Sequence, residues 1–192
     1  MKNILIGGTV RAGKSTLANL IRNKFKYSLV ESDTIVNAFD VVFPELGITH
    51  KKAEITRERY KPFLFEILNG FCRDLKYNGN VTIFPGAQFL PEQINEYPKK
   101  DKYIVIFLGI SDVSPQELMT KIREMDTASD WTNKRTDEQL LNNCKNIINE
   151  SKELKSQCEK FGFYYFDTFI NRIETLNKIL KIIEKENENI VQ

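Results

Sequence analysis

The chain has 192 residues, of which 41% are hydrophobic, so it is long enough to bury a sizeable core and of ordinary length for one domain. Its 28 Lys and Arg residues nearly balance its 26 Asp and Glu residues, which leaves a formal charge of +2. This balance argues against binding to nucleic acid or to a membrane through the field of the whole molecule. We therefore expect neither partner, and we expect any anion site to be local.

The chain has too few cysteines and histidines for a disulfide framework or a zinc site. Three widely spaced cysteines, Cys72, Cys144 and Cys158, suit reduced thiols better than disulfides. With one histidine, His50, there is no Cys/His set for zinc, and we interpret His50 as a surface or helix-start residue. The first apolar run is too short for a signal peptide, and no segment approaches the roughly 20 apolar residues that span a bilayer. These features predict a cytoplasmic protein.

Strand-like and helix-like segments alternate along the chain. Short runs rich in β-branched and aromatic residues predict buried strands at 3–6, 28–31, 81–84, 103–108 and 163–166. Longer stretches between them have helical spacing, and this alternation predicts a parallel sheet covered on both faces. The expected fold class is α/β, a three-layer α/β/α domain over residues 1–192 with about five parallel strands.

Apolar spacing locates the longer helices. One follows the first strand, one covers 137–161, a central one carries a stripe of Phe63, Ile67, Phe71 and Leu75, and a last one carries Ile170, Ile173, Leu176, Ile179, Leu180 and Ile183. The polar end, 184–192, is expected to fray. The polar stretch 126–136 lies between two helices and contains the single tryptophan, Trp131, which is typical of a functional loop or lid.

The first predicted strand leads into a phosphate-binding motif. Gly8, Gly13, Lys14 and Ser15 match G-x-x-x-x-G-K-[ST] in the strand-to-helix context that the motif requires. Glycines let successive backbone N–H groups point inward and form an anion cradle at a helix N-terminus. Lys14 can then reach the β- and γ-phosphates, and the Ser15 hydroxyl can ligate Mg²⁺. The predicted nucleotide-binding residues are Gly8, Thr9, Val10, Arg11, Ala12, Gly13, Lys14, Ser15 and Thr16.

Two classes of P-loop protein fit the rest of the sequence poorly. A GTPase needs Asn-Lys-x-Asp, but the nearest segment has Thr136 in place of the aspartate. A motor-type ATPase needs acidic residues after a central strand, but the third predicted strand is followed by Pro85 and Gly86 and the fourth by Gly109. Asp167 follows the last strand, where we interpret it as a helix N-cap or a loop residue. Phosphoryl transfer to a bound acceptor remains.

The chain resembles the P-loop kinases, specifically the small nucleoside, nucleotide and metabolite kinases related to adenylate kinase. The similar features are the P-loop, the strand that ends in "ESD" at 31–33, a helical region at 34–77, the polar segment 126–136 and the final strand "FYYFDT". The resemblance implies ATP- and Mg²⁺-dependent phosphorylation of a small molecule such as a nucleoside, a nucleotide or a phosphorylated metabolite. It also implies that 34–77 binds the acceptor and that 126–136 is a lid; we expect a monomer or homodimer.

The same resemblance implies roles for charged residues. Asp33 stands where such kinases often place an aspartate facing the γ-phosphate, able to accept the proton of the acceptor hydroxyl or to hold Mg²⁺; capping of the next helix is a compatible alternative. Arg123 and Arg135 are similar to the paired lid arginines that stabilise the transferring group, although both also fit solvated charges at helix ends. The predicted catalytic residues are Lys14, Asp33, Arg123 and Arg135, and the predicted Mg²⁺ ligands are Ser15 and Asp33.

One segment departs from the family pattern. Pro85 and Gly86 stand where adenylate-kinase relatives often have an aspartate followed by glycine, which removes an expected carboxylate near Mg²⁺. A second hypothesis therefore stays open, a nucleotide-binding regulatory protein of kinase fold without transfer activity. Gly86 leaves room for a substrate to approach closely, and Gln88 is either a substrate contact or a turn residue.

The acceptor side is less specific. A small basic cluster either holds an anionic acceptor or forms a solvated helix face with local ion pairs: Arg57, Arg59 and Lys61. Phe39, Phe43 and Phe89 line an acceptor pocket or, as is more usual for such aromatics, belong to the core. A polynucleotide 5′-hydroxyl kinase is a third hypothesis, which the near-neutral charge and the lack of a long basic stripe argue against.

Overall fold

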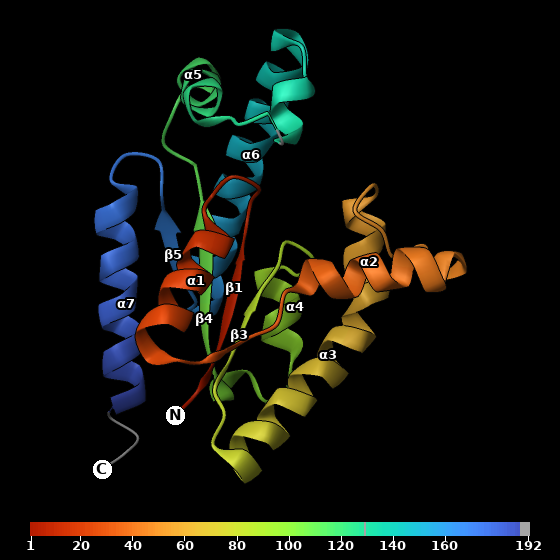
Figure 1. Ribbon diagram of the computed structural model, residues 1–192, viewed down its shortest axis with the longest axis vertical. Coiled ribbons are helices and arrows are strands. Elements are labelled where there is room, and N and C mark those ends of the chain that lie inside the picture. The colour runs from red at the N-terminus through yellow and green to blue at the C-terminus, as the bar shows by residue number, and fades with distance from the viewer. Residues whose placement is uncertain (129, 189–192) are drawn as a thin grey trace.

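A computed structural model describes residues 1–128 and 130–188. Its strands form one five-stranded sheet in the order β2-β3-β1-β4-β5, and every pair of neighbours is parallel (Figure 1). The strands are β1 (Asn3–Gly8), β2 (Ser28–Leu29), β3 (Thr82–Pro85), β4 (Tyr103–Gly109) and β5 (Tyr164–Asp167). The predicted α/β fold class and the parallel sheet of five strands are confirmed.

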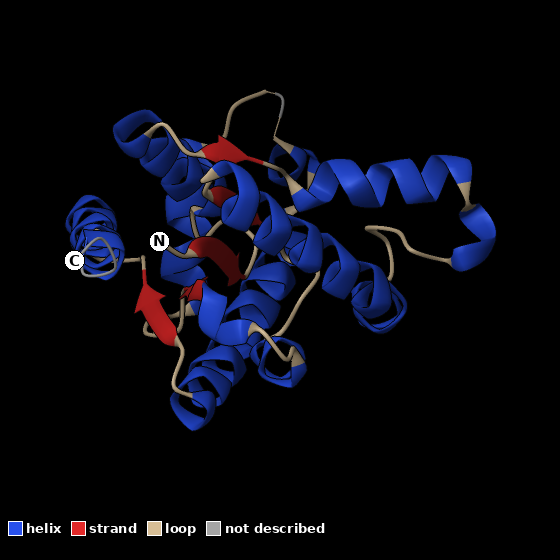
Figure 2. Ribbon diagram, turned by 90° about the horizontal axis from the view of Figure 1, so that it is seen from below, coloured by secondary structure: helices blue, strands red, loops and turns tan. Residues whose placement is uncertain are grey.

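Helices cover both faces of the sheet, as Figure 2 shows from below. They are α1 (Lys14–Phe25), α2 (Ser32–Val42), α3 (Ala53–Asn78), α4 (Pro91–Glu96), α5 (Pro115–Met125), α6 (Asp137–Phe161) and α7 (Arg172–Glu188). α2 projects sideways from the sheet (Figure 1). The apolar pattern did not indicate α4, because its six residues are too few to show a helical stripe.

Alternate side chains of the strands enter two apolar layers, since successive residues of a strand point to opposite faces. Ile4 and Ile6 of β1 pack in the layer that includes α1 and α7, whereas Leu5 packs in the layer that includes α3 and α4. α6 contributes to both layers, with Cys144 in the first and Leu154 in the second. β1 is therefore buried along its whole length, and the loop that follows it starts from a rigid position.

The buried face of α3 differs from the predicted stripe. Tyr60, Leu64 and Leu68 are fully buried, whereas Phe63 is 37% exposed. Ile67 and Phe71 lie partly buried at the edge of this face. The apolar stripe of α3 is wider than the face of the helix that the sheet covers. The predicted residues lie along the edge of that stripe, beside the buried face.

The last helix also begins and ends differently from the prediction. It starts at Arg172, so Ile170 lies in the preceding loop, and Ile170 and Ile173 are 70% and 79% exposed. Residues 184–188 are helical and not frayed, because the buried Asn187 accepts a hydrogen bond from the backbone of Lys2. Residues 189–192 of the predicted tail lie outside the described part. Among the described residues, no helix is both long and apolar enough to cross a bilayer.

Candidate active site

The loop between β1 and α1 has the backbone of a phosphate cradle. Gly8 and Gly13 have φ angles of 132° and 93°, which glycine adopts without strain. A Cβ on Gly8 would lie 2.0 Å from the carbonyl oxygen of Leu108, so β4 also requires glycine there. Gly13 is the N-cap residue of α1, and no side chain in the described part of the chain caps that terminus. The first amides of α1 are thus placed to bind an anion.

Lys14 is the first residue of α1 and folds back over the loop. Its Nζ donates hydrogen bonds to the carbonyl oxygens of Gly8 at 2.9 Å and Thr9 at 2.8 Å. Although part of the side chain reaches the surface, protein surrounds the ammonium group, and this desolvation lowers the pKa of Lys14 to about 8. The negative charges of Asp33 and Glu150 oppose the decrease. Lys14 is therefore a cation that a nearby phosphate would stabilise strongly.

Asp33 lies at the start of α2, just beyond the carboxyl end of β2. The N-cap residue of α2 is Glu31, so Asp33 does not cap this helix. Instead, Asp33 Oδ1 accepts a hydrogen bond of 2.5 Å from Gln88 Nε2. Gln88 is buried and its Oε1 accepts a bond from the backbone N–H of Ala87. Gln88 thus holds the exposed carboxylate of Asp33 in one orientation.

Gly86 serves the packing of this region. A Cβ on Gly86 would lie 2.7 Å from Ser32 Cβ, 2.8 Å from Gln88 Oε1 and 3.0 Å from Phe89 Cε1. The expectation that Gly86 leaves room for a substrate is therefore wrong, because protein atoms already occupy that space. The glycine is needed so that Gln88 can pack beneath Asp33.

A cavity of about 650 Å³ lies beside the P-loop. It is lined by the predicted site residues Gly8, Thr9, Val10, Asp33 and Arg135. Segments that follow β1, β2 and β3 contribute to it, as expected for a ligand site at the carboxyl edge of a parallel sheet. Of the four predicted catalytic residues, Asp33 and Arg135 line this cavity, and Lys14 bonds to the carbonyl oxygens of two residues that line it, Gly8 and Thr9.

Several lining residues were assigned no role or a doubtful one from the sequence. They are Asn37, Thr49, His50, Ala53, Thr56, Arg57, Ala87, Gln88, Trp131 and Glu150. His50 is exposed and lies just before α3, as the sequence suggested, and it also lines this cavity. Most of these residues belong to 34–77, the region expected to bind the acceptor.

An ion pair between distant helices forms one wall of the cavity. Arg57 of α3 pairs through Nη2 with Glu150 of α6, and its Nε donates to the carbonyl oxygen of Ala87 at 3.2 Å. The other members of the basic cluster make local contacts, Arg59 with the Leu46 carbonyl and Lys61 with Glu96. Only the arginine at the first position of the cluster lines the cavity, since residues two apart on a helix face different directions.

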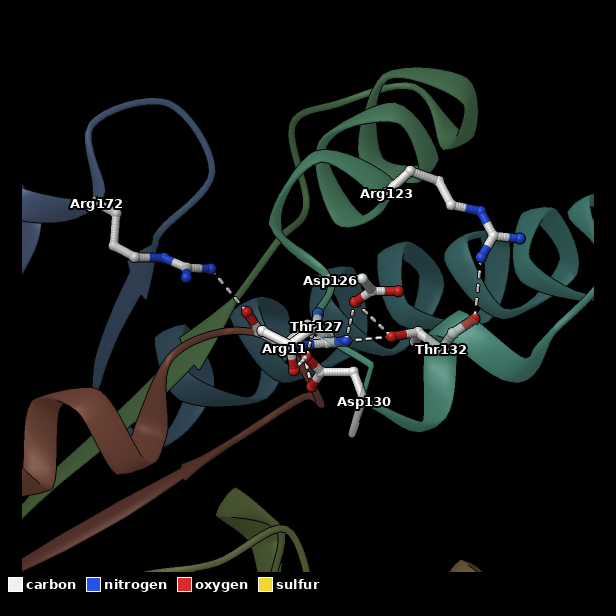
Figure 3. Close-up of polar contacts among 7 residues, drawn as sticks. All are labelled: Arg11, Arg123, Asp126, Thr127, Asp130, Thr132 and Arg172. Atoms are coloured by element: carbon white, nitrogen blue, oxygen red, sulfur yellow. Dashed lines mark hydrogen bonds and ion pairs between the residues drawn. The ribbon is translucent and has the colours of Figure 1, made fainter.

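The two lid arginines have different surroundings. Arg135 lines the cavity, and its guanidinium lies 5.8 Å from the ring centroid of Trp131. Within residues 1–128 and 130–188, its side chain makes no hydrogen bond or ion pair with the protein. Arg123 instead reaches from α5 to the backbone of the predicted lid, where it donates to the carbonyl oxygen of Thr132 (Figure 3). It also donates to the carbonyl oxygen of Arg135 and to Asp137. Arg123 does not line this cavity, and its contact with a transferring group stays a prediction.

The segment predicted to be a lid contains a short 3-10 helix, η3 (Trp131–Lys134), between α5 and α6. Ser129, within the predicted lid of 126–136, lies outside the described residues. Thr136 caps α6 by accepting a hydrogen bond from the backbone of Gln139. Asp167 ties loops together, since it accepts bonds from Ser111 and Phe169, in keeping with its interpretation as a loop residue.

The available donors suit Mg²⁺ better than a transition metal. Ser15 and Thr16 lie exposed on the first turn of α1 and offer hydroxyl oxygens, and Asp33 offers a carboxylate. Mg²⁺ prefers such oxygen ligands and usually takes one or two from protein, with phosphates and water completing the set. In the described ranges, no three or more His, Cys, Asp or Glu side chains group into a metal cage. A metal here would depend on nucleotide phosphates for several of its ligands.

Comparison with known proteins places the fold. No family model matches the sequence, and no curated protein matches it. A shikimate kinase from Bacteroides thetaiotaomicron is similar with a TM-score of 0.58 and 16% identity, covering 97% of this chain and 98% of that one. A gluconokinase from Sinorhizobium meliloti 1021 is similar with a TM-score of 0.61 and 13% identity, over 99% of this chain and 95% of that one. A shikimate kinase from Acinetobacter baumannii in complex with shikimate is similar with a TM-score of 0.53 and 15% identity, over 97% of this chain and 94% of that one. This chain therefore has the fold of the P-loop small-molecule kinases.

Proposed function

We propose that the protein is a kinase that transfers the γ-phosphoryl group of Mg·ATP to a hydroxyl group of a small molecule. The observation that carries this proposal is the single cavity lined by the start of the P-loop, Asp33 and Arg135, with the Lys14 ammonium bonded to the P-loop carbonyls at its edge. The similar solved structures, which include shikimate kinases and a gluconokinase, support a small-molecule acceptor.

The nucleotide half of the site uses the P-loop, Gly8 to Thr16. The backbone amides of the loop and the N-terminus of α1 bind the phosphates, as helix N-termini bind anions generally. Lys14 exchanges its bonds to the Gly8 and Thr9 carbonyls for bonds to phosphate oxygens. Ser15 and Asp33 would hold Mg²⁺, which, when bound, neutralises charge on the phosphate chain. These interactions neutralise negative charge on the γ-phosphoryl group that is transferred.

The acceptor half uses Asp33 and Arg135. Asp33, oriented by Gln88, accepts the proton of the acceptor hydroxyl as that oxygen attacks the γ-phosphorus. Arg135 has hydrogen-bond donors to spare and stabilises the negative charge on the transferring group. Closure of the lid around Trp131 excludes water, which would otherwise compete as an acceptor. Arg123 acts by holding the backbone of the lid.

The charges of the acceptor half point to an acceptor of low net charge. Arg57 is neutralised by its ion pair with Glu150, and Asp33 offsets Arg135. A phosphorylated acceptor would bring two further negative charges without a matching pair of unengaged cations. We therefore favour a hydroxylated molecule with at most one negative charge over a nucleotide or phosphosugar.

The test is ADP release from Mg·ATP in the presence of nucleosides, sugars, hydroxy acids and phosphosugars, with Asp33→Asn as the control. Stimulation by a neutral or singly charged acceptor, lost in the variant, supports the proposal. The alternative is a regulatory protein that binds nucleotide without transfer, a hypothesis that rests on Pro85 and Gly86 in place of an acidic segment. Tight ATP binding with no acceptor-dependent ADP release, unchanged by Asp33→Asn, would favour that alternative.

A further inference from the structure

One P-loop side chain reaches into the lid. Arg11 donates through Nη2 to Asp126 Oδ1 and Thr132 Oγ1, and its Nη1 lies 3.0 Å from Asp130 Oδ1 (Figure 3). Thr132 Oγ1 also donates to Asp126 Oδ1 at 2.7 Å, which closes a ring of three side chains. The Asp126 side chain is 3% exposed and Thr132 is fully buried. The bonds to Asp126 and Thr132 are thus shielded from water, where charge-assisted hydrogen bonds are strong, whereas the Asp130 side chain is 28% exposed.

The backbone of Arg11 is fixed as firmly as its side chain. Its φ is 65°, a left-handed conformation that non-glycine residues rarely adopt and that persists where surrounding contacts enforce it. Arg172, from the start of α7, donates to the Arg11 carbonyl oxygen at 2.7 Å. The other non-glycine residue with positive φ in the described chain, Lys26, ends a helix, where this conformation is common. Arg11 lies instead in the P-loop, where a left-handed residue helps successive backbone N–H groups to point toward a bound anion. This fixed backbone gives the Arg11 side chain a defined starting position.

Asp130, one of the three partners of Arg11, is itself held by further hydrogen bonds. Hydrogen bonds from the backbone and hydroxyl of Thr127 hold the pKa of Asp130 below its ordinary value, and the charge of Arg11 adds to this effect. Arg11 Nε and Asp126 Oδ2 are both buried without a partner in the described residues. In a side-on pairing, Arg11 Nε would donate to Asp126 Oδ2 while Nη2 keeps its bond to Oδ1, so both atoms would gain a partner. The ion pair can therefore form one more hydrogen bond than it does here.

The contact with Thr132 connects the P-loop to the acceptor cavity. Thr132 lies in η3 between Trp131 and Arg135, and both of these residues line the cavity. Arg123 holds the carbonyl oxygens of Thr132 and Arg135 from the α5 side. Two arginines therefore hold the segment that carries Arg135 by hydrogen bonds, Arg11 from the P-loop and Arg123 from α5.

We propose that Arg11 is a positioning residue that couples the nucleotide site to the acceptor site. Its backbone belongs to the phosphate cradle, and its side chain, through Asp126 and Thr132, sets the position of Arg135 over the acceptor. Occupation of the P-loop then steadies the lid, and the lid in turn steadies the loop. This inference rests on the proposed kinase function for its kinetic consequence, but the mechanical coupling between loop and lid does not.

The experiment compares Arg11→Gln with the wild-type chain, using Arg73→Gln, an exposed arginine of α3, as the matched control. The lid is followed by acrylamide quenching of Trp131, the single tryptophan, with and without Mg·ATP. We expect Mg·ATP to protect Trp131 in the wild type and in Arg73→Gln. In Arg11→Gln we expect that protection to be lost while the calorimetric ATP affinity stays within about threefold, because the backbone amides of the cradle remain.

Kinetics supply the second readout once an acceptor is known. Arg11→Gln should lower kcat/KM for the acceptor by about tenfold to a hundredfold, since a displacement of ~1 Å at a reacting site has effects of that order, with little change in KM for ATP. Arg11→Lys keeps the positive charge but lacks the planar guanidinium that bonds to three partners. Its kcat/KM for the acceptor should therefore lie between that of Arg11→Gln and that of the wild type. In the double variant with Asp126→Asn, the loss should not exceed that of the larger single variant.

Clear results would overturn the inference. Wild-type Trp131 protection and wild-type acceptor kinetics in Arg11→Gln would show that the side chain positions nothing. Additive losses in the double variant would show that Arg11 and Asp126 act separately. If Arg11→Gln does not fold, Asp130→Asn removes one partly exposed arm of the network, and unchanged Trp131 protection in that variant would count against the coupling. Absence of ATP binding or of transfer in the wild type would instead defeat the kinase proposal itself.

Discussion

Gln88 Nε2 donates a 2.5 Å hydrogen bond to Asp33 Oδ1, and this contact orients the carboxylate that we assign as the catalytic base. The two residues follow neighbouring strands, β3 and β2, so the rigid sheet sets their separation. Asp33→Asn should reduce kcat by about 10²- to 10⁴-fold, the usual contribution of general-base catalysis, while the affinity for metal-free ATP stays nearly unchanged because the P-loop amides remain. Steady-state kinetics with calorimetry will measure both. A variant with wild-type kcat would exclude Asp33 as the base.

The Gln88 contact makes its own prediction. Gln88→Met keeps the side-chain volume but cannot donate to Asp33, so the carboxylate gains freedom and kcat should fall by about tenfold, while KM for ATP should not change. Gln93→Met is the control, because Gln93 is also buried on this segment but bonds to the backbone of Leu90 and Arg57. Equal kcat values for Gln88→Met and wild type would show that the hydrogen bond has no catalytic role.

Gly86 should tolerate no side chain. Gly86→Ala places a Cβ 2.7 Å from Ser32 and 2.8 Å from Gln88, so we expect a loss of about 1–3 kcal/mol in the free energy of unfolding and a lower kcat. Gly70→Ala is the matched control, because its Cβ would meet its nearest neighbour at 3.9 Å and alanine favours a helix. Denaturant unfolding measures the difference; equal stability of the two variants would contradict the packing that we describe.

Lys14 predicts a specific pH dependence. Its pKa of about 8 in the folded protein lies below the ordinary 10.5, so between these pH values the unfolded chain holds a proton that the folded chain has lost. Through this residue, the stability of the ligand-free protein therefore rises with pH across that window. Nucleotide phosphates favour the charged ammonium, so binding above pH 8 should take up a proton, and ATP affinity should fall as the pH rises further.

Calorimetry at pH 9 in two buffers of different protonation enthalpy tests this linkage. The difference in apparent binding enthalpy should correspond to nearly one proton taken up per ATP, whereas at pH 7, where Lys14 is already protonated, its contribution should be close to zero. The nucleotide phosphates titrate near pH 6 and so contribute little at pH 9. Identical enthalpies in both buffers at pH 9 would contradict the lowered pKa of Lys14.

The ion pair between Arg57 and Glu150 predicts a change in acceptor preference. Glu150→Gln releases the charge of Arg57 into the cavity, so KM for negatively charged acceptors should fall by about three- to tenfold relative to neutral ones. Glu153→Gln, an exposed glutamate of the same helix, is the control. An unchanged ratio of KM values would mean that this pair does not set the charge of the acceptor site.

The sequence predicted those parts of the molecule that depend on neighbours along the chain. The α/β fold class and the parallel sheet of five strands are confirmed, because the strands are short apolar segments and their alternation with helices predicts a parallel sheet. The exposed Phe63 and Ile173 were misplaced for the opposite reason: whether an apolar residue of a helix is buried depends on how much of that helix the sheet covers.

Contacts between distant segments had no sequence signal. Arg57 and Glu150 are 93 positions apart, and Arg11 and Asp126 are 115 apart. A charged residue on a helix gives the same local pattern whether it lies in solvent or faces a partner, so Glu150 was not distinguished from its neighbours. Arg11 was assigned to the phosphate site from its position in the motif, and the reach of its side chain into the lid became visible only in the fold.

The central claim is that a phosphoryl group passes to a bound organic hydroxyl. The most direct measurement incubates the protein with Mg·ATP labelled in the γ-phosphate and a mixture of small hydroxylated molecules, and identifies labelled products by mass spectrometry. We predict label on one organic hydroxyl, absent with Asp33→Asn. Label found only in inorganic phosphate, or remaining wholly in ATP that binds the protein, would contradict the claim.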